Sequence, residues 1–150
     1  IGMVLQTVQG SNYIMSEIEK QDVIKGYQKL IDNYSNNLFK GPLPSTLELK
    51  HIKQYSNREY LNPDLETIRR DYLVTEKANG ERCLLYIAKD NKIYMITRSG
   101  KGSQSVKYTG SSLLNHAQTL LDGEYITIDL RDNTVSTFLY FDVYYYIWIV

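Results

Sequence analysis

The sequence predicts an α+β fold in which an amphipathic helix precedes an antiparallel sheet built from hairpins. Two observations support this prediction. Apolar residues recur with helical spacing near the start of the chain and, from residue 72 onwards, apolar runs of strand length alternate with short polar turns. A chain of 150 residues with 43% hydrophobic residues is long enough to bury a core.

The helix is expected to begin at Ser16, because Ser16 and Glu19 have the spacing of a capping box, in which each side chain satisfies a free backbone N–H group of the other. The residues with helical spacing on its apolar face are Val23, Ile24, Tyr27, Leu30, Ile31 and Tyr34. No residue of this helix requires chemistry, so we interpret it as a packing element.

A loop with two prolines, residues 40–45, is the best candidate for a domain boundary, because each proline restricts its own backbone and that of its predecessor. We therefore expect residues 1–40 to be a helical adaptor or linker from a preceding domain, and residues 41–150 to be the main domain. Smaller elements are expected as a strand within residues 1–10, a short edge strand at 46–52 and a brief helix from Pro63 to about Arg70.

The main domain is expected to be rich in strands, because its apolar runs are short and are separated by turn residues. The chain ends in the apolar run Tyr144 to Val150, which is expected to be a strand cut short in a piece of a longer protein. The predicted elements are strands 84–89 and 92–98 around a turn at Asp90-Asn91, a functional polar loop at 99–110, a helix with apolar residues from Leu113 to Leu121 that ends at Asp122-Gly123, and strands 124–131 and 134–143 around a turn at Asp132-Asn133.

The charge balance excludes a strong overall electrostatic field. Seventeen basic and seventeen acidic residues cancel, so a nucleic acid would have to contact a local patch. The single cysteine, Cys83, cannot form a disulfide within the chain, which fits a reducing, cytoplasmic compartment. No apolar stretch reaches the ~18 residues of a membrane span, so we expect no membrane partner.

The first candidate for chemistry is Lys77, which ends one apolar run and is separated from the next by the small-residue turn Ala78-Asn79-Gly80. A lysine is a nucleophile as the free amine. Gly80 lets a phosphate or a base approach the backbone closely. The plain alternative is a β-hairpin with a solvated turn.

Three further positions carry groups suited to a nucleotide. Arg98 ends a strand that opens a glycine loop, where it could contact ribose or phosphate. Glu124 follows Asp122-Gly123 and could accept hydrogen bonds from ribose hydroxyls or help to hold a cation. Phe141, beside the mid-strand Asp142, could stack on a base. The plain alternatives are a solvated strand end, a simple turn and a core aromatic residue.

In their order along the chain, these positions resemble the motifs of the covalent nucleotidyltransferases, namely the mRNA capping enzymes and the ATP-dependent DNA and RNA ligases. The matching segments are Glu76 to Arg82 for motif I (K-x-D-G-x-R), Ile96 to Gly100 for motif Ia, Leu121 to Glu124 for motif III (D-G-E), and Leu139 to Val143 for motif IIIa. The segment Leu38 to Glu48 is similar to the one that precedes this domain in capping enzymes of large DNA viruses, which favours a guanylyltransferase over a ligase.

The resemblance implies the N-terminal part of an antiparallel, ligase-like nucleotidyltransferase core. It implies that Lys77 attacks the α-phosphate of GTP, forms a lysyl-GMP intermediate and passes GMP to the 5′-diphosphate end of RNA, which creates the mRNA cap. By position, Arg82 would contact phosphate, Arg98 and Glu124 the ribose, and Phe141 the guanine. A divalent cation, Mg2+ or Mn2+, would offset charge on the phosphates.

The chain departs from the family pattern in two ways. Asn79 replaces the usual aspartate of motif I, and the sequence ends before motifs IV and V, so we expect incomplete catalysis from this segment alone. The alternatives are the adenylation domain of an ATP-dependent DNA or RNA ligase and a non-catalytic fragment that serves as an adaptor. A viral relative would be expected in the host cytoplasm or the virion, with flanking triphosphatase and methyltransferase domains.

Overall fold

The computed structural model describes residues 12–31, 41, 46–52, 68, 74, 76–130 and 133–147. The chain divides into two compact units, one formed by Ile1–Pro42 with Ala78–Val150 and the other by Leu43–Lys77. The expected domain boundary near residue 41 stays a prediction. The predicted elements at 1–10, at Pro63 to Arg70 apart from Ile68, and at the Asp132 turn lie outside the described residues.

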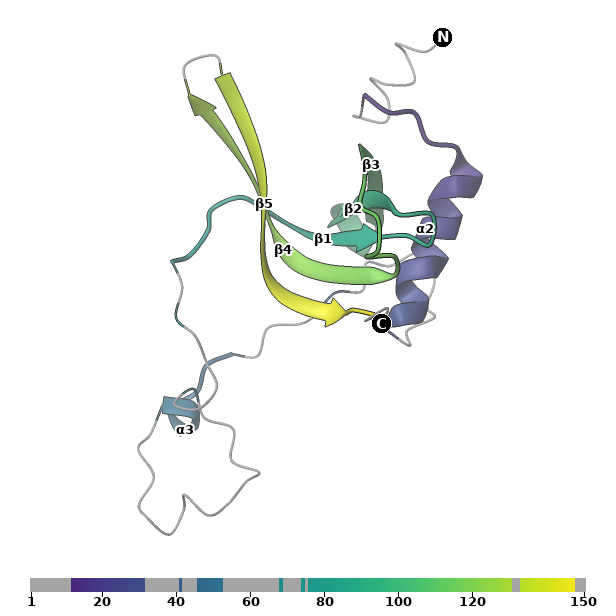
Figure 1. Cartoon of the computed structure of the whole chain (residues 1–150). Helices are drawn as coiled ribbons and strands as arrows, with labels where there is room; N and C mark the ends of the chain where they lie inside the picture. Colours follow the sequence, from purple (N-terminus) through teal and green to yellow (C-terminus); the bar gives the residue numbers. More distant parts are fainter. Residues whose placement is uncertain are drawn as a thin grey trace. The chain divides into compact units, whose positions relative to one another are not determined.

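The first unit contains a helix and a five-stranded sheet (Figure 1). The strand order is β3-β2-β1-β4-β5, and every neighbouring pair is antiparallel. The predicted α+β class is therefore confirmed. The elements of this unit are α2 (Glu17–Leu30), β1 (Glu81–Ile87), β2 (Lys92–Arg98), the 3-10 helix η2 (Gly100–Gly102), β3 (Gln104–Ser112), β4 (Thr119–Leu130) and β5 (Asn133–Tyr145).

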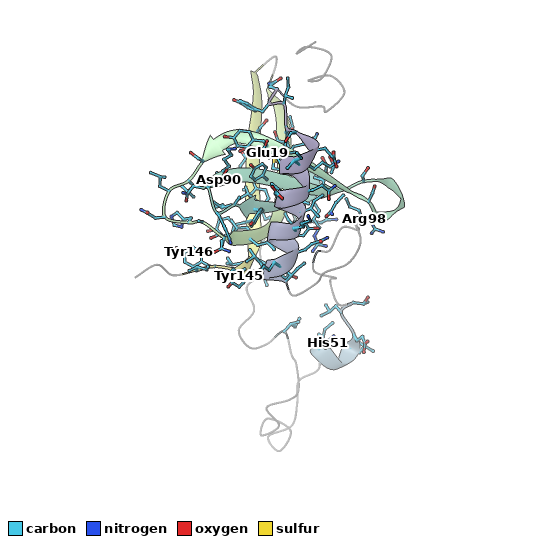
Figure 2. All side chains as sticks on the ribbon, turned by 90° about the vertical axis from the view of Figure 1, so that its right-hand side faces the viewer. Glu19, His51, Asp90, Arg98, Tyr145 and Tyr146 are labelled. Atoms are coloured by element: carbon cyan, nitrogen blue, oxygen red, sulfur yellow. The ribbon has the colours of Figure 1, made fainter. Side chains whose placement is uncertain are left out.

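Helix α2 begins where the capping box predicts. Ser16 is the N-cap, and its Oγ accepts a hydrogen bond from the backbone N–H of Glu19 over 3.1 Å. The Glu19 carboxylate accepts hydrogen bonds from Lys92 Nζ at 3.2 Å and Tyr94 Oη at 2.9 Å, both on β2. The side chain predicted to complete the cap therefore ties the helix to the sheet, and Figure 2 shows α2 lying across the strands.

One face of the sheet packs against α2 and forms the core. On the helix, Val23, Ile24 and Tyr27 are buried, while Leu30 and Ile31 are partly buried against the same core. Five of the six predicted helix contacts are therefore confirmed, and Tyr34 lies outside the described residues. The other buried members of this cluster are Met15, Leu84, Tyr86, Tyr94, Ile96, Val106 and Leu120.

Strands β4 and β5 extend beyond the rest of the sheet. β1 pairs with β4 from Thr119 to Tyr125, whereas the pairing of β4 with β5 continues to Leu130 opposite Asn133. The resulting two-stranded ribbon projects from the sheet in Figure 1. Register shifts interrupt this ladder, and one of them falls between Asp122 and Gly123, inside the candidate site.

The predicted hairpin around Asp90-Asn91 forms, and β4 pairs with β5, but the predicted edge strand at residues 46–52 is wrong. Leu49–Ile52 is a short helix, α3, in the second unit. His51 closes a local turn there, because its Nδ1 accepts a hydrogen bond from the Glu48 N–H at 2.9 Å and its own N–H donates to the Glu48 carbonyl at 3.0 Å. Local hydrogen bonds of this kind compete with an extended strand.

The predicted long loop at 99–110 is also wrong, because β3 begins at Gln104. Gln104 and Val106 are buried, and Ser105 and Lys107 between and after them are more exposed. This alternation is that of a strand with one face on the core. The polar character of the segment conceals the pattern, since the first inward residue is a glutamine.

The predicted helix from Leu113 to Leu121 is wrong as well. Asn115 and Gln118 have φ angles of 65° and 58°, which an α-helix does not allow. Residues 113–118 therefore form a loop, and β4 starts at Thr119. Leu113 is exposed, so its place in an apolar pattern was accidental.

The buried Cys83 predicts a loss of stability at alkaline pH. Burial raises the pKa of this thiol to about 12, from its ordinary value of 9.0. Because the folded state holds the proton more tightly, the full stability is present below pH 9 and is lost as pH rises from there towards 12. Between pH 8 and 10.5 we expect Cys83→Ala to lose less unfolding free energy than wild type, by on the order of 1–2 kcal/mol.

Urea unfolding at several pH values measures this difference. The comparison uses the slope with pH, because the smaller alanine side chain also lowers stability at every pH. Burial raises the pKa of Tyr86 and Tyr94 too, and both remain in the two proteins, so their contributions cancel. Equal slopes for the two proteins would contradict the assignment to Cys83.

Candidate active site

Motifs I and III meet because β1 and β4 are neighbouring strands. Their antiparallel register places Arg82 opposite Glu124 and Leu84 opposite Asp122. Residues opposite one another point to the same face of a sheet, as do residues two apart on one strand. The side chains of Arg82, Asp122 and Glu124 therefore share one face, although about 40 residues separate the two motifs along the chain.

Arg82 and Asp122 form a two-pronged ion pair. Arg82 Nη2 lies 2.7 Å from Asp122 Oδ2, and Arg82 Nε donates to Asp122 Oδ1 at 3.2 Å. The Asp122 side chain is 2% exposed and that of Arg82 is 40% exposed. The hydrogen bond with Asp122 is the main reason that the pKa of Arg82 is raised. Asp122 is thus a buried anchor that orients the partly exposed Arg82 side chain.

Two glycines allow the strands around this pair to approach closely. A Cβ atom on Gly80 would lie 2.3 Å from the carbonyl oxygen of Tyr125, and one on Gly123 would lie 2.4 Å from that of Leu139. Backbone atoms cannot move aside as a flexible side chain can. The glycines of motifs I and III are therefore required by packing between β1, β4 and β5, whatever their role toward a ligand.

Glu124 holds the turn that precedes β1. Its Oε1 accepts a hydrogen bond of 2.7 Å from the backbone N–H of Gly80. The Glu124 side chain therefore crosses from motif III to motif I beside the Arg82–Asp122 pair. A carboxylate that accepts from a backbone N–H makes a charge-assisted hydrogen bond, which is stronger than a neutral one.

Phe141 lies at a bulge in β5. Asp122 pairs with Asp142 and Gly123 with Tyr140, so Phe141 has no opposite residue on β4. A bulge re-aims side chains and often lies beside a functional site. The Phe141 side chain is 55% exposed, so the alternative of a core aromatic residue is wrong.

Arg98 is the last residue of β2 and is exposed. Thr97 on β2 pairs with Cys83 on β1. Because the strands are antiparallel, Arg98 after Thr97 and Arg82 before Cys83 lie at the same end of the two strands. Figure 2 shows Arg98 and the turn residue Asp90 at opposite ends of the sheet. The sheet therefore brings Arg82, Arg98 and Glu124 to one of its ends, with Phe141 on the neighbouring edge strand.

Lys77 is exposed and belongs to the unit Leu43–Lys77, while the unit with the sheet resumes at Ala78. Four residues along the chain from Lys77, β1 begins at Glu81. Asn79, which replaces the motif aspartate, is also exposed. The roles of the five predicted site residues stay predictions.

Asp122 is a site residue that the sequence pattern did not reveal. A charged residue within a strand needs a partner or a site, and Asp142 also lies within a strand. Asp142 is exposed, and its Oδ1 accepts from the N–H of Val143 at 2.8 Å. The same rule applies to Asp122, which lies two residues before Glu124. Its carboxylate is buried, and its cationic partner is Arg82 on the neighbouring strand β1.

The described residues do not by themselves form a ready metal site. No group of three or more His, Cys, Asp or Glu side chains among them could hold a metal ion. The Asp122 carboxylate is bound by Arg82, and one oxygen of Glu124 is bound by Gly80.

No helix in the described part of the chain has the length and apolar character of a membrane span.

An antiparallel sheet that brings these motifs together is the core of a nucleotidyltransferase. Comparison with known protein families agrees with this class: the family described as mRNA capping enzyme, catalytic domain, matches residues 5–146. The chain therefore belongs to the mRNA capping enzyme catalytic domain family. No curated protein is similar enough to the chain to count as a match.

Proposed function

We propose that this chain is part of an mRNA 5′-cap guanylyltransferase that uses Lys77 as its nucleophile. The observation that carries the proposal is the pairing of β1 with β4, which places Arg82 opposite Glu124 within a member of the capping enzyme family. Lys77 precedes the first of these strands by four residues. Family membership supports GTP over ATP as the nucleotide.

In the first step, the neutral Nζ of Lys77 attacks the α-phosphorus of GTP. A P–N bond forms, the P–O bond to the β-phosphate breaks, pyrophosphate leaves, and the nitrogen gives up a proton. In the second step, a terminal oxygen of 5′-diphosphate RNA attacks the same phosphorus. The P–N bond breaks, the nitrogen regains a proton, and the RNA carries the cap.

The other predicted residues have roles that fit their positions. Arg82 is held by Asp122 and its side chain is 40% exposed, which suits a contact to phosphate. We assign the ribose to Arg98 and Glu124, which lie at the same end of the sheet, and the guanine to Phe141, which is 55% exposed and could stack on a base. We also propose a divalent cation, Mg2+ or Mn2+, although the described residues assign it no ligands.

Labelling with nucleotide tests the proposal. Full-length protein incubated with α-labelled GTP is expected to retain label through denaturing electrophoresis, as an acid-labile adduct. Lys77→Ala and Lys77→Arg should both abolish the adduct. Lys89→Ala, which removes an exposed lysine beside the β1–β2 turn at the other end of the sheet, is the matched control and should retain it.

The possible results separate the competing functions. An adduct from α-labelled ATP and none from GTP would identify a ligase-type adenylation domain. No adduct from either nucleotide with full-length wild-type protein would overturn an enzymatic role, and would favour a non-catalytic adaptor.

A further inference from the structure

The hydrogen bond between Gly80 and Glu124 links two segments that have separate roles in the proposed reaction. Glu124 Oε1 lies 2.7 Å from the backbone nitrogen of Gly80, 44 residues away in sequence. Gly80 follows Lys77 by three residues. Gly80 is held to β4 by this bond, and the three-residue backbone from Gly80 to Lys77 can reach at most roughly 10 Å.

The close approach of Gly80 to β4 brings its N–H group within reach of Glu124. Gly80 lies so close to β4 that a Cβ atom would be 2.3 Å from the Tyr125 carbonyl oxygen and 3.1 Å from Glu124 Cγ. Glu124 lies directly opposite Arg82, and Arg82 follows Gly80 by two residues. The Glu124 side chain therefore extends along β1 towards its start, where it accepts from the Gly80 N–H group. The absence of a side chain at position 80 permits this close approach, and Glu124 supplies the acceptor oxygen.

We propose that Glu124 is a positioning residue for Lys77, acting through the Gly80 N–H group. The proposal rests on the proposed function and adds to the ribose contact suggested there. The carboxylate has two oxygens: Oε1 binds the turn, and Oε2 is the one that ribose hydroxyls can share. Fixing the turn limits the positions that the attacking amine can sample, and small misplacements of a nucleophile reduce rates strongly.

The nucleotide sugar provides the decisive comparison. A residue that acts only by binding the ribose has no effect when the ribose hydroxyls are absent, whereas a positioning residue affects the reaction with any sugar. Adduct formation should therefore be measured in full-length protein with saturating GTP and with saturating 2′,3′-dideoxy-GTP. Glu124→Ala is expected to lower the maximal rate by roughly 10- to 100-fold with both nucleotides.

Conservative and control variants sharpen the test. Glu124→Gln keeps an oxygen that can accept from Gly80, so it should lower the rate less than Glu124→Ala does. Glu81→Ala removes an exposed carboxylate from the opposite face of β1 and should leave the rate unchanged.

Amide hydrogen exchange at Gly80 gives a readout that does not depend on catalysis. The Gly80 N–H should exchange at least about 10-fold faster in Glu124→Ala than in wild type, and at the wild-type rate in Glu81→Ala. If an adduct forms but exchange at Gly80 is the same in wild type and Glu124→Ala, the positioning role is wrong. It is also wrong if the Glu124→Ala defect disappears with dideoxy-GTP, or changes KM alone.

Failure of the proposed function looks different. Wild-type protein would then form no adduct with GTP, and the role of Glu124 in the reaction would fall with it. Faster exchange in Glu124→Ala would in that case show that the bond is structural only.

Discussion

Arg82→Met should lower the free energy of unfolding by about 3–5 kcal/mol, because it leaves a buried carboxylate without its counterion. The Asp122 side chain is 2% exposed, so its charge depends on the guanidinium for most of its stabilisation. Methionine keeps the length and apolar stem of arginine, so the loss reports mainly on the charge and its hydrogen bonds. Urea unfolding at pH 7, followed by circular dichroism, measures it.

Removing the opposite partner should have a smaller effect. In Asp122→Asn the remaining arginine is 40% exposed and can be hydrated, so we expect a loss of roughly 1–3 kcal/mol. The double variant Arg82→Met/Asp122→Leu replaces the pair by apolar groups and should be more stable than Arg82→Met alone. Equal losses in the two single variants would contradict the view that Asp122 is the buried anchor.

Gly123→Ala is the second change with a large expected effect. Its Cβ would lie 2.4 Å from the Leu139 carbonyl oxygen and 2.5 Å from the Phe138 ring, so β4 and β5 would have to separate. We expect a loss of about 3 kcal/mol or more in unfolding free energy, at or above the upper end of typical overpacking. The shift in urea midpoint, with the denaturant slope as a check, measures this loss.

Gly100→Ala is a matched control for this substitution. A Cβ at Gly100 meets no atom within 4 Å, and the residue does not have a positive φ angle. Its replacement should change stability by less than about 0.5 kcal/mol. If Gly123→Ala were as mild as Gly100→Ala, the close approach of β4 and β5 described above would be incorrect.

The parts of the fold that were predicted from sequence are those with local signals. The capping box located the start of α2, and Asp90-Asn91 located the first hairpin, where Asn91 adopts the left-handed φ of 66°. The errors lie where tertiary contacts determine the secondary structure. β3 begins at Gln104, whose Oε1 accepts a hydrogen bond from the buried Tyr27 hydroxyl of α2. No local pattern reveals that a glutamine faces the core.

The site was predicted in the same partial way. Motif order identified Arg82 and Glu124, but strand register was needed to see that they stand opposite one another. The requirement for Gly80 was attributed to a ligand, whereas the structure shows that the Tyr125 backbone already excludes a side chain there. Contacts between strands distant in sequence depend on register, and one residue of slip would change all of them.

This dependence on register sets where the chain can change length. Inserting one residue within β1, or between Asp122 and Glu124, would move the motif side chains beyond it to the opposite face of the sheet. The loop at 113–118 connects β3 to β4 outside the motifs, and Leu114 at its tip is 72% exposed. Added residues there leave the pairing of β1 with β4 intact, so this loop is a suitable place for a tag or an inserted domain.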